Sequence, residues 1–116
     1  MKSINMTSMM SHVSLPGRTA YSTSKAGLLG FTKALALELA SEQITVNGIS
    51  PGPCATELNK PLLENPELTQ FFLSRIPAGR WGRPEEIGQL AVFLCSEAAG
   101  FITGTDIVID GGWMAQ

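Results

Sequence analysis

Two β-like segments separated by a long helical segment constrain the fold of this chain more than any other feature. Residues 3–7 and 43–49 carry the apolar and β-branched residues typical of strands, and residues 21–40 between them are predicted to form a helix. A strand, a helix and a second strand in this order form a βαβ unit, in which the two strands run parallel. The sequence therefore predicts an α/β fold built on a parallel sheet.

The second half of the chain adds a helix and a third strand. A proline and two acidic residues begin a helix predicted over 84–97, where apolar residues recur at helical spacing. Residues 105–109 are predicted to form the last strand, and residues 57–77 a short helical excursion with an apolar face. Ligands of open parallel sheets bind beyond the carboxyl ends of the strands, so we expect a site where these three strands end.

The helix predicted over 21–40 is apolar nearly all the way round, which is typical of a helix covered on more than one side. One side would pack on the sheet. We expect the other side, together with the C-terminal strand, to contact further subunits in a homo-oligomer, a dimer or tetramer. Gly27 and Gly30 each cost about 1 kcal/mol in a helix relative to alanine. Two interpretations of them stay open, a close backbone approach or simple tolerance.

The composition argues against nucleic-acid, membrane and metal partners. The net charge is −2 and no block of like charges occurs, so no electrostatic footprint for nucleic acid or an anionic membrane is visible. No apolar run approaches the ~18 residues of a membrane span, and the first residues do not resemble a signal peptide. Cys54 and Cys95 are isolated from other metal-ligand residues and from each other. We therefore expect a cytoplasmic protein without metal.

Tyr21 and Lys25 stand four residues apart at the start of the predicted helix, and Ser8 precedes Tyr21 by thirteen residues. A phenol, with an unperturbed pKa of about 10, exchanges protons poorly at neutral pH. A positive charge within about 4–6 Å favours the phenolate, and helical spacing places the two side chains on one face. Tyr21 is thus predicted to be the acid or base, with Lys25 tuning its pKa and Ser8 orienting the substrate oxygen. A nicotinamide must then supply or accept the hydride.

His12 lies in the loop between Ser8 and Tyr21. We interpret it as a solvated or packed residue, because a lone histidine in a polar loop is usually one of these. Contact with a substrate is the alternative interpretation.

Several segments resemble the short-chain dehydrogenase/reductase family, and the resemblance extends over essentially the whole chain. The segments 20–27 (AYSTSKAG) and 47–52 (NGISPG) are close matches, and 5–8 (NMTS) is similar to the family's strand-end Asn-x-Ser-Ser motif. The spacing of thirteen residues from Ser8 to Tyr21 also matches. Near the C-terminus, 79–86 and 102–112 resemble further signatures of the family.

This resemblance implies that Ser8, Tyr21 and Lys25 are catalytic. It also implies that Lys25 hydrogen-bonds the nicotinamide ribose, that Pro51 and Gly52 line the nicotinamide, and that the backbone of Cys54 and the hydroxyl of Thr56 contact its carboxamide. The implied cofactor-contacting residues are therefore Tyr21, Lys25, Pro51, Gly52, Cys54 and Thr56. The implied fold is a doubly wound, Rossmann-type sheet, of which residues 1–116 form the C-terminal half as a single partial domain.

Family members are about twice as long as this chain, and no Gly-rich turn follows a first strand here. We therefore expect the N-terminal dinucleotide-binding half to be absent, the chain alone to be inactive, and the choice between NAD and NADP to stay open. One hypothesis is the catalytic portion of an NAD(P)(H)-dependent oxidoreductase that interconverts a secondary alcohol and a ketone. Its relatives would be 3-oxoacyl-carrier-protein reductases, sugar or polyol dehydrogenases, or tropinone-reductase-like enzymes. The other hypothesis is a truncated, non-catalytic association module that retains the family's subunit contacts.

Overall fold

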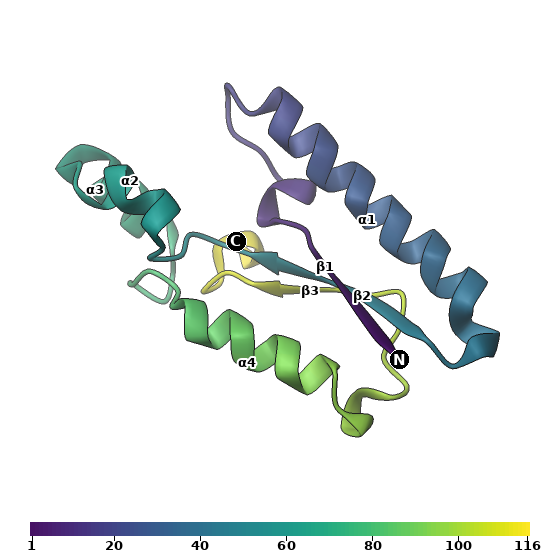
Figure 1. Cartoon of the computed structure of the whole chain (residues 1–116). Helices are drawn as coiled ribbons and strands as arrows, with labels where there is room; N and C mark the ends of the chain where they lie inside the picture. The colour runs from purple at the N-terminus through teal and green to yellow at the C-terminus, as the bar shows by residue number, and fades with distance from the viewer.

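A parallel sheet with the strand order β1-β2-β3 forms the centre of the computed structural model, which describes residues 1–116 (Figure 1). Strand β2 is hydrogen-bonded on both edges, and Ile49 in it stands opposite Met6 on one side and Ile107 on the other. The strands are Lys2–Met6 (β1), Thr45–Pro51 (β2) and Asp106–Ile109 (β3). The predicted α/β fold with a parallel sheet is confirmed.

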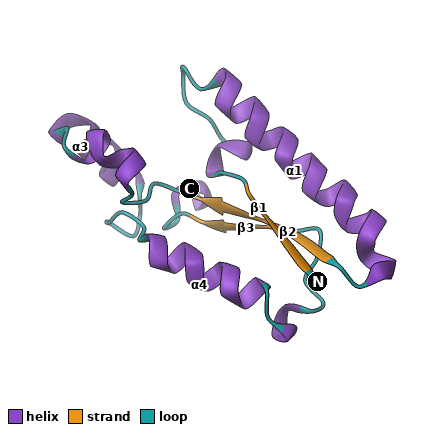
Figure 2. Cartoon of the chain, viewed as in Figure 1, coloured by secondary structure: helices purple, strands orange, loops and turns teal.

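The two longest helices cover opposite faces of the sheet (Figures 1 and 2). Helix α1, Thr19–Leu39, contacts one face, where Asn5 Nδ2 donates to Thr32 Oγ1 at 2.9 Å. Helix α4, Pro84–Leu94, packs Leu94 against Ile49 on the other face. The connection from β1 to β2 through α1 and the connection from β2 to β3 through α4 both move the chain in the same direction across the sheet. Because the two helices lie on opposite faces, the two crossovers have opposite hands. Right-handed crossovers are the general rule, so one of the two departs from it.

Two short helices, α2 (Lys60–Leu63) and α3 (Pro66–Arg75), lie beyond the carboxyl end of the sheet and form the predicted excursion (Figure 1). Asn65 caps α3, because its side chain accepts hydrogen bonds from the backbone of Glu67 and Leu68 at 3.1 Å each. Phe72 of α3 packs in an apolar cluster with Met9, Ile76 and Trp113. Apolar packing therefore attaches the excursion to the turns that follow β1 and β3.

Two predicted element boundaries need correction, and the others differ by one or two residues. The strand predicted over 43–49 begins at Thr45, because Gln43 adopts a left-handed φ of 58° that ends the preceding helical turn. It continues to Pro51, which stands opposite Ile109. The helix predicted over 84–97 ends at Leu94, because Ser96 is extended.

The side of α1 that faces away from the sheet is not covered by any other part of this chain. Only Thr32 and Ala36 of the helix are buried, and Leu37 is 82% exposed. A Cβ on Gly27 or Gly30 would meet nothing within 4 Å, so neither glycine serves a close approach inside the chain. None of the helices combines the length and apolarity that crossing a bilayer requires.

The glycines of β2 and α1 generate a paired stability prediction. A Cβ at Gly48 would overlap Asp106 Oδ1, and that carboxylate cannot retreat because three donors hold it. We expect Gly48→Ala to lower the free energy of unfolding by about 1–3 kcal/mol, as overpacking does. Gly27→Ala, in open space on a helix, should raise it by about 0.5–1 kcal/mol. Urea unfolding followed by circular dichroism measures both, and equal effects would contradict the prediction.

Candidate active site

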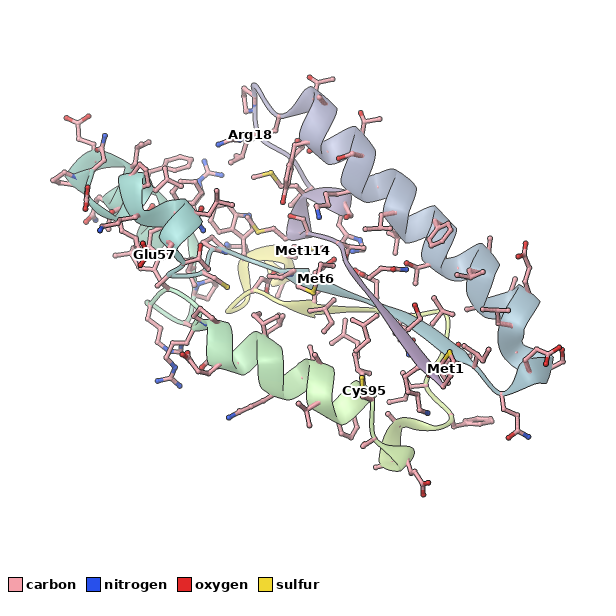
Figure 3. All side chains as sticks on the ribbon, in the orientation of Figure 1. Met1, Met6, Arg18, Glu57, Cys95 and Met114 are labelled. Carbon is pink, nitrogen blue, oxygen red and sulfur yellow. The ribbon has the colours of Figure 1, made fainter.

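A cavity of about 680 Å³ opens at the carboxyl end of the sheet, where sequence analysis predicts a site. Its wall includes Arg18, which precedes α1, and Met6, which ends β1; both are labelled in Figure 3. The predicted site residues that line it are Ser8, Tyr21, Pro51, Gly52, Cys54 and Thr56. The loop after β3 lines a separate cavity of about 320 Å³ instead. Lys25 lies beside the main cavity, next to Tyr21.

Ser8 is held in place by the turn that follows β1. It is extended, with φ −161° and ψ 154°, and caps the short helical turn Met9–Ser11. Its Oγ accepts a hydrogen bond from the Met10 backbone N–H at 3.1 Å, and the residue is 7% exposed. No protein acceptor takes the Ser8 hydroxyl proton. The hydroxyl is therefore free to donate to an oxygen atom that enters the cavity.

Tyr21 and Lys25 project from the first turns of α1 on one face, as their spacing predicts. The Lys25 ammonium lies 5.8 Å from the centre of the Tyr21 ring, within the range of a cation–π interaction. Lys25 Nζ also donates to the carbonyl of Met6 at 2.8 Å, which fixes the lysine against the end of β1. Tyr21 is 46% exposed and its hydroxyl makes no hydrogen bond within the chain. The phenol therefore stands free at the cavity wall beside a fixed positive charge.

The segment after β2 forms the opposite wall. Gly52 passes so near the loop after β3 that a Cβ there would lie 2.8 Å from Asp110 Cα, so only glycine fits. Cys54 forms a parallel bridge with Gly82 and is 7% exposed. Burial, with a smaller contribution from the Glu86 carboxylate, raises the pKa of the Cys54 thiol, which keeps the thiol protonated. The Cys54 backbone N–H has no acceptor within the chain and is a free donor at this wall.

The segment 79–86 supports that wall through one carboxylate. Glu86 accepts two hydrogen bonds from the Arg80 guanidinium, at 2.7 and 3.2 Å, and one from the Arg83 backbone N–H at 3.1 Å. The Arg80 hydrogen bonds, followed by that from Arg83, lower the pKa of Glu86 to about 2. Because Glu86 lies in the first turn of α4, its carboxylate also accepts a hydrogen bond from a backbone N–H that the helix leaves unpaired at its N-terminus, and it complements the positive end of the helix dipole.

The chain matches the family described as enoyl-(acyl carrier protein) reductase over residues 2–114. It is 44% identical over 109 residues to the 3-oxoacyl-[acyl-carrier-protein] reductase FabG of Aquifex aeolicus, with 94% of this chain covered and 43% of that protein. The chain belongs to the short-chain dehydrogenase/reductase family. The predicted family and the predicted Rossmann-type fold are both confirmed.

Solved structures similar to this short-chain dehydrogenase/reductase chain include complexes with nicotinamide cofactors. A 4-hydroxyisoleucine dehydrogenase complexed with NADH superposes with a TM-score of 0.97 at 39% identity, covering 99% of this chain and 47% of that one. A gluconate 5-dehydrogenase of Burkholderia cenocepacia with NADP and tartrate superposes with 0.95 at 34% identity, covering 99% and 45%. The chain thus spans about half the length of the relatives it matches.

Sequence analysis missed two charged residues at this candidate site. Arg18 is the one charged side chain along the cavity wall, and it gives the cavity a positive end. Asp106 lies behind Ser8 with its side chain only 4% exposed. The signal for Asp106 was present, because a charged residue in the otherwise apolar run 106–109 needs a buried partner.

The buried carboxylate of Asp106 generates a pH prediction. Burial alone would raise its pKa, but hydrogen bonds from Ser50, Thr7 and His12 together hold the pKa below its ordinary value of 3.8. A carboxyl with a lowered folded-state pKa contributes stability above its unfolded pKa, and this stability is lost as the pH falls through the folded-state value. We therefore expect the stability difference between the wild type and Asp106→Asn to be complete near neutral pH and to shrink below pH 3.8.

Urea unfolding at a series of pH values measures this difference, and Glu86→Gln is the matched control. Both variants remove a carboxylate of lowered pKa, but Glu86 belongs to a pair with exposed arginines, so added salt should weaken its effect. The effect of Asp106→Asn should persist in salt, because that site is buried. A stability difference for Asp106→Asn that stays constant down to pH 2 would contradict the assignment.

Proposed function

We propose that this chain carries the catalytic, nicotinamide-side half of an NAD(P)(H)-dependent oxidoreductase that interconverts a secondary alcohol and a ketone. The observation that carries the proposal is the convergence of three groups on one cavity edge: the free hydroxyls of Ser8 and Tyr21, and the fixed ammonium of Lys25. In support, relatives are named as reductases and dehydrogenases of 3-oxoacyl and sugar-acid compounds.

The residues of the cavity fit the nicotinamide end of such a cofactor. The unpaired Cys54 N–H is a suitable donor for a carboxamide oxygen, and Pro51 and Gly52 offer a flat wall for the ring. Thr56 stands further along the same wall, and its hydroxyl proton is available because Thr56 Oγ1 only accepts a hydrogen bond, from Asn59 N–H at 3.3 Å. The residues that would hold the dinucleotide phosphates belong to a Gly-rich turn that this chain does not contain.

The proposed chemistry assigns one task to each side chain. A bound nicotinamide supplies or accepts the hydride at the substrate carbon. Ser8 donates a hydrogen bond to the substrate oxygen and orients it. Tyr21 gives its hydroxyl proton to that oxygen in reduction and takes it back in oxidation, while the Lys25 ammonium stabilises the phenolate.

A second candidate function, an association module, is favoured by the apolar surface. Phe31 and Leu37 on α1 are 53% and 82% exposed, and Val92 and Phe101 on the opposite side of the sheet are 72% and 102% exposed. Both outer strands also present unpaired edges. We propose a homo-oligomer through α1 and β3, and a reducing compartment such as the cytoplasm, which suits two free cysteines.

Titration of the chain with NADH and NADPH, followed by cofactor fluorescence, tests the proposed function. Because the chain offers contacts for the nicotinamide end only, we expect weak but saturable binding, with an affinity about tenfold weaker still in Lys25→Ala, because a charged hydrogen-bond donor is removed. Lys33→Ala, two turns further along α1, is the control of equal charge and should bind like the wild type. A folded wild-type chain that binds neither nucleotide would contradict the catalytic proposal and favour the association module.

Tyr21→Phe separates chemistry from binding. Removing one hydroxyl without hydrogen-bond partners in the chain should leave the urea midpoint unchanged and weaken NADPH binding by no more than about tenfold, the effect of losing one neutral hydrogen bond. In a protein that also carries the dinucleotide-binding half, turnover of a 3-oxoacyl thioester should fall by about 10²–10⁴-fold, the contribution typical of a general acid. NADPH oxidation measured by absorbance reports the rate. Retained turnover would end the proposed role of Tyr21.

A further inference from the structure

A carboxylate that the proposed chemistry does not use lies buried directly behind Ser8. Asp106 begins β3, faces α1 and has a side chain that is 4% exposed. The backbone leaves room for it, because only a glycine at position 48 avoids overlap with Asp106 Oδ1. Burying a carboxylate costs free energy unless it is paired and fully hydrogen-bonded. The hydrogen-bond partners of Asp106 therefore show which segments it holds in place.

Three donors converge on this carboxylate, two from the segment that follows β1 and one from β2. Thr7 Oγ1 donates to Asp106 Oδ1 at 2.5 Å, and Ser50 Oγ donates to Oδ2 at 2.5 Å. His12 Nε2 lies 2.7 Å from Oδ2, so this ring nitrogen must carry a proton to bond an ionised carboxylate. We call Thr7, His12, Ser50 and Asp106 the Asp106 cluster.

The donors of the Asp106 cluster bracket Ser8 in the chain and in space. Thr7 directly precedes Ser8, and His12 ends the helical turn that Ser8 caps. Ser50 Oγ lies 3.0 Å from the Ser8 carbonyl oxygen, so the third donor contacts Ser8 itself. Both ends of the segment that positions the Ser8 hydroxyl are therefore attached to one carboxylate. The His12 bond is the outermost attachment, because that side chain is 27% exposed.

We propose that Asp106 and His12 are positioning residues for Ser8, which lock the segment 7–12 so that the Ser8 hydroxyl faces the cavity. The inference rests on the proposed function only for the use made of Ser8. The lock itself is a property of this chain. It also gives His12, which does not itself line the cavity, a role in the site.

Amide hydrogen exchange on the ¹⁵N-labelled chain tests the lock without a cofactor. The Met10 N–H donates to Ser8 Oγ and the Ser11 N–H to the Ser8 carbonyl, at 3.1 and 2.8 Å, so their exchange rates report how firmly Ser8 is held. We expect His12→Ala to speed both by about tenfold, as loss of a hydrogen bond to a charged group predicts. The Cys95 N–H, bonded to Ala91 in α4, should not change.

Conservative and remote variants make the test specific. His12→Gln keeps an N–H donor near the position of Nε2 and should restore slow exchange at Met10 and Ser11. Glu86→Gln removes an ion-paired carboxylate elsewhere and should leave both rates unchanged. Asp106→Asn should speed both rates more than His12→Ala, but it also loosens three strands, so the histidine variants decide the question.

Unchanged exchange at Met10 and Ser11 in His12→Ala would overturn the proposal. Fast exchange in His12→Gln as well would also overturn it, because the imidazole would then act by its volume rather than by its bond to Asp106. A wild-type chain that binds neither NADH nor NADPH would refute the proposed function instead. The exchange rates would still show whether Asp106 and His12 hold the segment 7–12 in place.

Discussion

The parallel pairing of β2 with a strand on each of its edges brings the segments that line the cavity to one end of the sheet. Parallel strands end at the same side of a sheet, so the segments that follow β1 and β2 emerge together there. Ser8 and the segment 51–56, more than forty residues apart, thereby line one cavity. Val46, Ile49 and Ser50 of β2 are fully buried, which ties this placement to the most protected part of the molecule. A shift of one residue in the register would turn Ser50 away from Asp106 and Ile49 away from Leu94.

The two faces of β2 stabilise the sheet by different physics. On the α4 face, Ile49 packs with Leu94 and Ala99, and the gain comes from apolar burial. On the α1 face, Ser50 and Gly48 meet a buried carboxylate and the Thr7 hydroxyl, and the cost of burying that charge is offset only by complete hydrogen bonding. Polar interiors of this kind are directional, and they fix geometry more narrowly than apolar packing does. The polar face is also the one from which the turn carrying Ser8 rises.

The cavity and the apolar outer surfaces lead to the two functional hypotheses, and the structure shows how both arise from one chain. The cavity wall brings together groups suited to an alcohol or ketone oxygen and to a nicotinamide. The bare side of α1 and the outer edges of β1 and β3 are the surfaces that lack partners inside this chain. Since the chain spans about half the length of its relatives, a further segment or a second subunit would find apolar surface there to bury. The cavity residues are held by contacts within the chain, independently of what covers those surfaces.

The sequence by itself determined the order of strands and helices, the family, and the common face of Tyr21 and Lys25, because periodicity and an i, i+4 spacing are local properties. It did not determine where β2 begins, since that depends on the left-handed turn at Gln43, nor that the exposed glycines of α1 touch nothing in this chain. It also did not reveal that His12 bonds to Asp106, a residue ninety-four positions away. That contact exists only because β3 pairs with β2 and brings its first residue beneath the Ser8 turn. Partners so distant in the chain are chosen by the packing of the whole sheet, and no local pattern encodes them.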